Sequence, residues 1–142
     1  RIIVRNDQIF IYYCGVQGAH TGPKFPRVER QHLPAIGLAT LRRDGFVSLD
    51  ADSEPGFVLT KPFCLPSGDI HLNVDAQNGQ VTLAICDTSG KPLPGLESSE
   101  LITGDNLDAI VRWSNSENVL PVGKEVRLRI DATCAKLYSF WF

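Results

Sequence analysis

The chain has 142 residues, of which 43% are hydrophobic and 21% charged, and 14 Lys and Arg against 16 Asp and Glu leave a formal net charge of −2. A chain of this length can bury a hydrophobic core without a structural metal ion, so we expect one globular domain and not a disordered one. The balanced charge excludes a broad basic surface for nucleic acid, and no apolar run approaches the roughly 20 residues of a membrane-spanning helix.

Met is absent, and Arg1 leads directly into an apolar run. We therefore expect the natural start to lie upstream, either because a precursor is processed or because this is part of a larger protein. The four cysteines are widely spaced, without a Cys-x-x-Cys or Cys/His cluster, so no metal site is predicted; they are Cys14, Cys64, Cys86 and Cys134. Two disulfides of a secreted protein and free buried thiols both remain open.

Strand patterns dominate the chain, and no window has helical periodicity free of Gly or Pro. Short apolar or β-branched runs bounded by turn residues cover residues 9–14, 35–41, 46–49, 57–60, 70–74, 81–86, 109–113, 126–130 and 136–141. About nine or ten such strands predict an all-β domain built as an antiparallel β-sandwich of the jelly-roll or lectin-like type. A closed eight-stranded barrel is the structural alternative.

Three turns are indicated between these strands. Asn78-Gly79 separates two apolar runs and predicts a two-residue hairpin of type I′, in which both central residues have positive φ. Asp44-Gly45 predicts a second hairpin, which joins the strand ending at Leu41 to residues 46–49. Residues 87–90 predict a further turn after Cys86.

Two of the predicted strands have patterns that assign their faces. Residues 126–130 alternate between apolar and charged side chains, which is typical of an antiparallel strand with one buried face. Near the C-terminus, alternation predicts that Tyr138, Phe140 and Phe142 share one face while Leu137 and Trp141 share the other. We interpret these rings, with Trp113, as core residues; stacking against sugars is the functional alternative.

The long irregular stretch 15–34 is the first place to look for a ligand, because loops of this length in a compact domain are often functional. His20, Arg27, Arg30 and His32 can form a pocket for an anion or a sugar acid, since guanidinium groups bind carboxylates in a bidentate way. A solvated loop is the plainer interpretation. A second long connection, residues 92–108, is also rich in acidic residues.

No pattern in the chain predicts catalysis or a cofactor. Residues 50–54 place three carboxylates at alternate positions, as a calcium loop begins, but Pro55 and Lys61 then stand where that loop requires Gly and Glu. We interpret this segment as a solvated acidic turn. Serine-nucleophile motifs, Cys–His pairs and phosphate-binding glycine loops are all absent from the sequence.

Several strings together resemble a known family. They are IFIYYCG at 9–15, IGLATLRRDGFVSLD at 36–50, LNVDA at 72–76, GKPLPG at 90–95, VRLRI at 126–130 and AKLYSFWF at 135–142. These strings are similar to the C-terminal end of bacterial proteins related to the β-propeller glycosidases of glycoside hydrolase families 32 and 43. The resemblance implies that residues 1–50 are the end of a five-bladed propeller and that residues 51–142 are an appended β-sandwich, the two forming one compact unit.

The blades that would carry the family's catalytic acids are not in this sequence, so the resemblance assigns no catalytic residue. It implies an extracellular or periplasmic, non-catalytic module associated with carbohydrate, whose partners are a glycan and an upstream propeller. Two alternatives remain open: a structural subunit that forms oligomers or fibres by strand addition, and a fragment of an active glycoside hydrolase whose propeller lies upstream.

Overall fold

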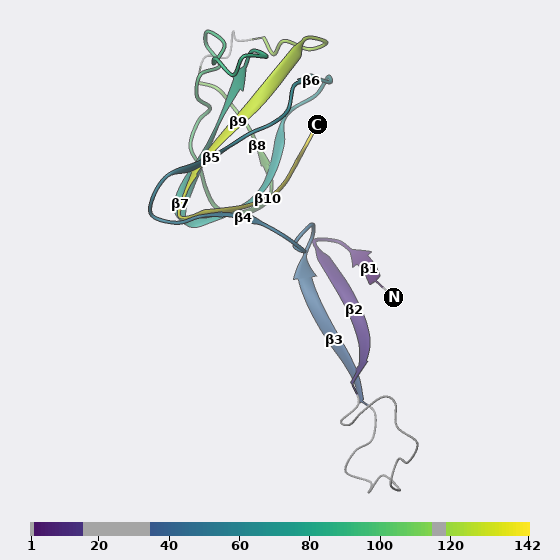
Figure 1. Cartoon of the computed structure of the whole chain (residues 1–142). Coiled ribbons are helices and arrows are strands. Elements are labelled where there is room, and N and C mark those ends of the chain that lie inside the picture. The colour runs from purple at the N-terminus through teal and green to yellow at the C-terminus, as the bar shows by residue number, and fades with distance from the viewer. Residues whose placement is uncertain (1, 16–34, 115–118) are drawn as a thin grey trace, which may run out of the picture. The chain divides into compact units, whose positions relative to one another are not determined.

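The computed structural model describes residues 2–114 and 119–142, apart from residues 16–34, and all regular elements in these ranges are β-strands (Figure 1). All paired strands are antiparallel, which confirms the predicted all-β antiparallel class. The strands are β1 (Ile2–Arg5), β2 (Gln8–Gly15), β3 (Ala35–Arg42), β4 (Leu49–Ala51), β5 (Gly56–Leu59), β6 (Phe63–Cys64), β7 (His71–Cys86), β8 (Ile102–Ile110), β9 (Glu125–Thr133) and β10 (Ala135–Trp141). This part of the chain has no helix that could cross a membrane.

The chain divides into two compact units, Arg1–Gly45 and Phe46–Phe142. The first unit is a three-stranded sheet in the order β1-β2-β3. A tight turn joins β1 to β2, with Asn6 in the left-handed region at φ 53°. Another turn ends the sheet, where Asp44 has φ 58° and the Gly45 N–H donates to the Arg42 carbonyl oxygen at 3.0 Å. The predicted hairpin at this turn is wrong, because the next strand, β4, pairs with β10 in the second unit.

β7 is a single strand of 16 residues, so the hairpin predicted at Asn78-Gly79 is also wrong. Neither residue has the positive φ that a type I′ turn requires. Gly79 instead lies against the backbone of the neighbouring strand: a Cβ there would overlap the Thr133 carbonyl oxygen and lie 2.6 Å from the Cys134 carbonyl oxygen. Glycine is therefore required at this position for close approach of two backbones and not for a turn.

The second unit is built on a bent antiparallel sheet. β9 pairs with residues 80–86 of β7, and β10 pairs with residues 71–75 along the same edge, so β9 and β10 together follow β7 through a corner. Cys134 joins β9 to β10 with φ 47°. β4 pairs with β10 and β5 pairs with β9 on the far side, while β8 lies along the other edge of β7. We call the part with β10 the first arm and the part with β9 the second arm.

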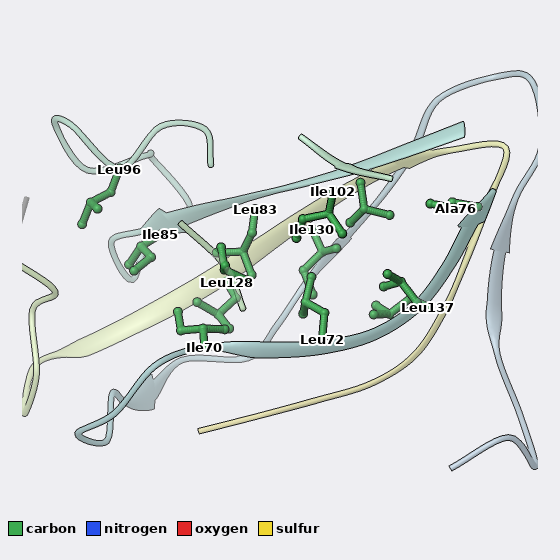
Figure 2. Close-up of a cluster of buried hydrophobic side chains, with 14 of the residues drawn as sticks. Ile70, Leu72, Ala76, Leu83, Ile85, Leu96, Ile102, Leu128, Ile130 and Leu137 are labelled. Carbon is green, nitrogen blue, oxygen red and sulfur yellow. The ribbon is translucent and has the colours of Figure 1, made fainter. Parts of the chain in front are cut away.

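The core lies between the two arms, as Figure 2 shows. Leu72 and Leu137 point inward from the first arm, and Leu83, Leu128 and Ile130 point inward from the second. These side chains belong to one cluster of buried apolar residues, and they are at most 7% exposed. The alternation predicted for residues 126–130 is confirmed, since its apolar members are buried.

β8 is found where the sequence predicted a connection. Residues 102–110 form this strand although they include Gly104 and polar side chains, whereas residues 111–113 of the predicted strand lie beyond its end. The register between β7 and β8 is irregular in two places, so the apolar side chains of β8 do not alternate in sequence. For this reason the sequence of β8 lacks the alternating pattern by which a strand is predicted.

The turn predicted at residues 87–90 is confirmed. The Gly90 N–H donates to the Asp87 carbonyl oxygen at 3.0 Å, and Gly90 has φ 91°. Hydrogen bonds from the Ser89 hydroxyl and the Lys91 backbone N–H hold the pKa of the Asp87 carboxyl below its ordinary value. This bonding contributes stability above the unfolded-state pKa, and the contribution is lost as the pH falls through the lower folded-state pKa.

A buried serine completes the edge of β7 beyond β8. The Leu83 N–H donates to the Ser99 hydroxyl at 2.9 Å, and the Ser99 N–H donates to the Leu83 carbonyl oxygen at 2.8 Å. Ser99→Ala leaves the buried Leu83 N–H without its acceptor, so we expect the free energy of unfolding to fall by about 1–3 kcal/mol. Urea unfolding measures this, with Ser98→Ala as the control because the Ser98 side chain is exposed and donates only to a carbonyl oxygen at 3.3 Å. Equal losses of unfolding free energy in the two variants would contradict the role of the Ser99 hydroxyl as the acceptor for the Leu83 N–H.

The predicted faces of the C-terminal strand are partly wrong. Leu137 is opposite Val74 and Trp141 is opposite His71, so they lie on different faces, because the register shifts between Leu137 and Ser139. Phe140 and Phe142 do meet, with ring centroids 6.1 Å apart in an edge-on arrangement. The extra residue in this bulge reverses the alternation that the sequence alone suggests.

Candidate functional site

The ligand pocket predicted from His20, Arg27, Arg30 and His32 lies outside the described residues. The four thiols are unpaired. The interpretation as free buried thiols holds for Cys86 but not for Cys14 and Cys64, which are exposed, and Cys134 is half-buried. Burial raises the pKa of the Cys86 thiol. Other candidate sites lie on the surfaces of the two units.

The sheet of the first unit is apolar on the face that contains Ile9. Direct cross-strand partners share a face, which puts Ile2 and Val4 of β1 beside Ile9, Ile11 and Tyr13 of β2. Leu41 of β3 completes the row opposite Ile9. Of these side chains only Ile9 is buried, at 3% exposure, while Val4 is 62% exposed.

The opposite face of this sheet is apolar over part of its length, beyond a polar row of Arg5, Gln8 and Arg42 at one end and Thr40 beside Phe10. It carries Ile3 from β1, Phe10 and Tyr12 from β2, and Ile36 and Leu38 from β3. Ile36 is 84% exposed, and Tyr12 and Leu38 are about half exposed. An antiparallel sheet at a protein surface ordinarily has one polar face, so a sheet with exposed apolar side chains on both faces is suited to being covered on both sides. The two faces together are called the blade surface below.

The second unit has a polar hollow of about 300 Å³ at the corner of its sheet. Its charged side chains come from β4, from the connection after β4, from β7 and from β10: Asp50, Asp52, Asp75 and Lys136. Lys136 is directly opposite Asp50 on one side and Asp75 on the other, so the three side chains share a face of the sheet. We call this place the corner hollow.

The acidic segment 50–54 contributes Asp50, Asp52 and Ser53 to the lining of this hollow. Among the described residues, no three or more His, Cys, Asp or Glu side chains are grouped so that they could hold a metal ion. No local pattern connects this segment with Asp75 and Lys136, because their proximity depends on strand pairing between distant segments.

An apolar trough opens the core of the second unit between β4 and β5. Two adjoining hollows of about 340 and 240 Å³ share Leu49, Val58, Ile130 and Leu137 as lining residues. Ile130 and Leu137 also belong to the buried core, whereas Leu49 is 56% exposed. The core of this unit therefore reaches solvent at the edge of the bent sheet.

The aromatic side chains predicted as core or sugar-stacking residues serve different roles. Phe142 packs against the core and contacts Phe63, with ring centroids 5.7 Å apart. Trp141 stacks on His71 at 5.4 Å, and the His71 Nδ1 lies 2.6 Å from the Asp108 carboxylate. Because the His71 ring already stacks on Trp141, the indole is less suited to stacking on a sugar.

The outer face of the second arm carries charge that is internally paired. Arg129 forms hydrogen bonds of 2.8–3.1 Å to both oxygens of Asp131, and its guanidinium carbon lies 4.5 Å from the centroid of the Phe57 ring. The hydrogen bonds to Asp131 raise the pKa of Arg129 above its ordinary value. This surface therefore presents a satisfied ion pair and is a weaker candidate than the corner hollow.

Comparisons of the chain with protein-family models, with curated proteins and with solved structures find no match.

Proposed function

We propose that this chain is the end of a carbohydrate-active propeller protein, in which Arg1–Gly45 belongs to a propeller blade and Phe46–Phe142 is an appended, non-catalytic β-sandwich module. The observation that carries the proposal is the blade surface, because both of its faces present exposed apolar side chains, the second of them beyond the polar row of Arg5, Gln8 and Arg42. A propeller blade is a small antiparallel sheet packed between two neighbouring blades, so both of its faces must be apolar. A sheet that packs against a single neighbour would need only one apolar face.

The second unit supports the same proposal. Its arms face each other across one core, as the halves of a sandwich do. The family's catalytic acids belong to propeller blades that the resemblance places upstream of these residues. On the same resemblance we propose that any glycosidase activity belongs to the propeller and that the module is extracellular or periplasmic.

A second candidate function is a structural subunit that assembles by strand addition. It is favoured by the outer edge of β3, which has no partner strand among the described residues. An open edge can pair with a strand of another copy, and a repeated head-to-tail contact builds a filament. In that case the same apolar faces would be covered by neighbouring copies.

Ile36→Lys tests whether another sheet covers the blade surface in the natural protein. Ile36 is 84% exposed in the chain alone, so a lysine there is harmless unless another sheet lies on it. We expect the variant to lose on the order of 3 kcal/mol in free energy of unfolding. A lysine beneath a neighbouring sheet must either lose its hydration or break the contact with that sheet. Thermal unfolding together with light scattering measures both effects.

Val119→Lys is the matched control, since Val119 is 87% exposed and lies outside the blade surface. It is expected to leave the melting temperature within a degree or two of the wild type. Equal melting temperatures for the two variants, with an unchanged assembly state, would show that nothing covers Ile36 and would remove the basis of the proposal.

A further inference from the structure

The Asn78-Gly79 pair lies inside an extended strand and not in a turn, and this placement bears on its chemistry. Asparagine loses its side-chain amide most readily before glycine, because glycine has no side chain to hinder attack by its own backbone nitrogen. We infer that Asn78 is a modification site, which the fold keeps intact and which is converted to aspartate and isoaspartate when β7 opens. The site goes beyond the proposed function and does not depend on it.

The conversion needs only the chain itself and water. The backbone nitrogen of Gly79 attacks the side-chain carbonyl carbon of Asn78, so that a new C–N bond closes a succinimide ring. The bond from that carbon to the side-chain nitrogen breaks, and this nitrogen leaves as ammonia with the proton of the Gly79 amide. Water then opens the ring at either carbonyl group. One product has an ordinary aspartyl linkage, and the other has an isoaspartyl linkage, in which the backbone is longer by one carbon.

The strand geometry of β7 opposes the closing of this ring. In extended backbone the nitrogen of the following residue lies out of reach of the side-chain carbonyl carbon, so Asn78 must first rotate about its Cα–C bond. That rotation displaces Gly79. The backbone of Gly79 lies so close to Thr133 and Cys134 that an added Cβ would overlap the Thr133 carbonyl oxygen. The closed corner therefore leaves little room for the rotation.

This backbone restraint is what protects the pair, because the Asn78 side chain is exposed and water reaches it. The conversion rate of the folded chain should therefore follow the population of conformations in which the corner is open. In the unfolded chain the restraint is lost, and the pair reacts at the rate set by its sequence.

The isoaspartyl product does not fit the corner. β7 pairs with β10 as far as Asp75 and with β9 from Gln80, so the residues between them set the spacing of the two ladders. One extra backbone carbon in this short segment shifts one ladder against the other, and the close-packed core between the arms resists that shift. A chain that is modified while unfolded is therefore expected to refold poorly.

The test is to incubate the 142-residue chain at mildly alkaline pH, both in buffer and in concentrated guanidinium chloride. Mass spectrometry of the peptide that contains residue 78 then measures the loss of the amide. We expect the conversion to be at least about tenfold slower in the folded chain. Asn106 of β8 is the internal control, because leucine follows it, and it should stay intact under both conditions.

Asn78→Gln is the matched variant, because glutamine keeps the amide but has to close a larger and less favourable ring. Both chains are returned to buffer after equal times in guanidinium chloride. The refolded fraction, measured by circular dichroism, should fall in step with the conversion of Asn78 in the wild type and stay unchanged in the variant. The inference is overturned if Asn78 converts equally fast in the folded and unfolded chains, if it does not convert in the unfolded chain, or if the converted chain refolds as completely as the unmodified one.

Discussion

Gly79→Ala is expected to lower the free energy of unfolding by more than about 3 kcal/mol. The added Cβ would overlap the Thr133 carbonyl oxygen and lie 2.6 Å from the Cys134 carbonyl oxygen. Both are backbone atoms of the strand pair that forms the corner, and the hydrogen-bonded ladders on either side hold them in place. Neither backbone can move away without breaking these hydrogen bonds. A single added methyl group is therefore expected to separate the strands at the corner. Chemical unfolding followed by circular dichroism measures the loss.

Gly56→Ala is the matched control in β5. The nearest atom to its added Cβ is the Ala51 Cβ at 3.8 Å, an ordinary contact, and Gly56 does not have positive φ. We expect a change of less than about 1 kcal/mol, and it can be stabilising because alanine restricts the unfolded chain. A loss of only about 1 kcal/mol for Gly79→Ala, similar to that for a glycine in an open turn, would favour the hairpin and contradict the bent strand.

Leu72→Ala and Leu128→Ala are each expected to cost about 2–5 kcal/mol, the range for removing a large side chain from a close-packed core. Both leucines are fully buried, one in each arm of the sheet. Because the two arms share a single core, we expect each variant of the 142-residue chain to destabilise the whole second unit in one cooperative transition. Urea unfolding followed by tryptophan fluorescence and by circular dichroism tests this.

Leu101→Ala is the control, since Leu101 is 61% exposed, and we expect it to change stability by less than about 0.5 kcal/mol. The transitions seen by the two probes should coincide in both core variants. If either core variant instead unfolds in two steps, with one arm lost before the other, then the arms do not share a core. That result would contradict the description of the second unit as one bent sheet.

Local patterns predicted the parts of this fold that depend on local chemistry. The alternation in residues 126–130 identified β9 and its buried face, because one side of that strand meets the core and the other meets water. The turn at Asp87 was predicted because its carboxylate bonds to backbone N–H groups within four residues. Such features do not depend on which strand lies next to which.

Features that depend on distant strands could not be predicted. Asn78-Gly79 has the composition of a hairpin turn, but the glycine is needed for the close approach of a backbone some 50 residues away in the chain. The bulge near Tyr138 reverses the faces of β10, and the irregular register of β8 conceals a whole strand. One extra residue in a strand moves all later side chains to the other face.

The candidate site shows the same limit. The sequence drew attention to the acidic residues of segment 50–54 but offered only a metal site or a solvated turn. The hollow appears only when β4, β7 and β10 are aligned, which places Lys136 between Asp50 and Asp75. The blade surface was visible as apolar strands, yet its two exposed faces became evident only once the strands were paired.

Whether the first unit is part of a propeller is tested most directly by the intact mass of the protein isolated from its source. Mass photometry of the same sample gives the assembly state. We predict a mass per chain well above 15.6 kDa, because a blade needs neighbouring blades to cover both of its faces. A chain of 15.6 kDa in large assemblies would favour strand addition instead. A chain of 15.6 kDa that stays monomeric would contradict the account, since the apolar faces would then have no cover at all.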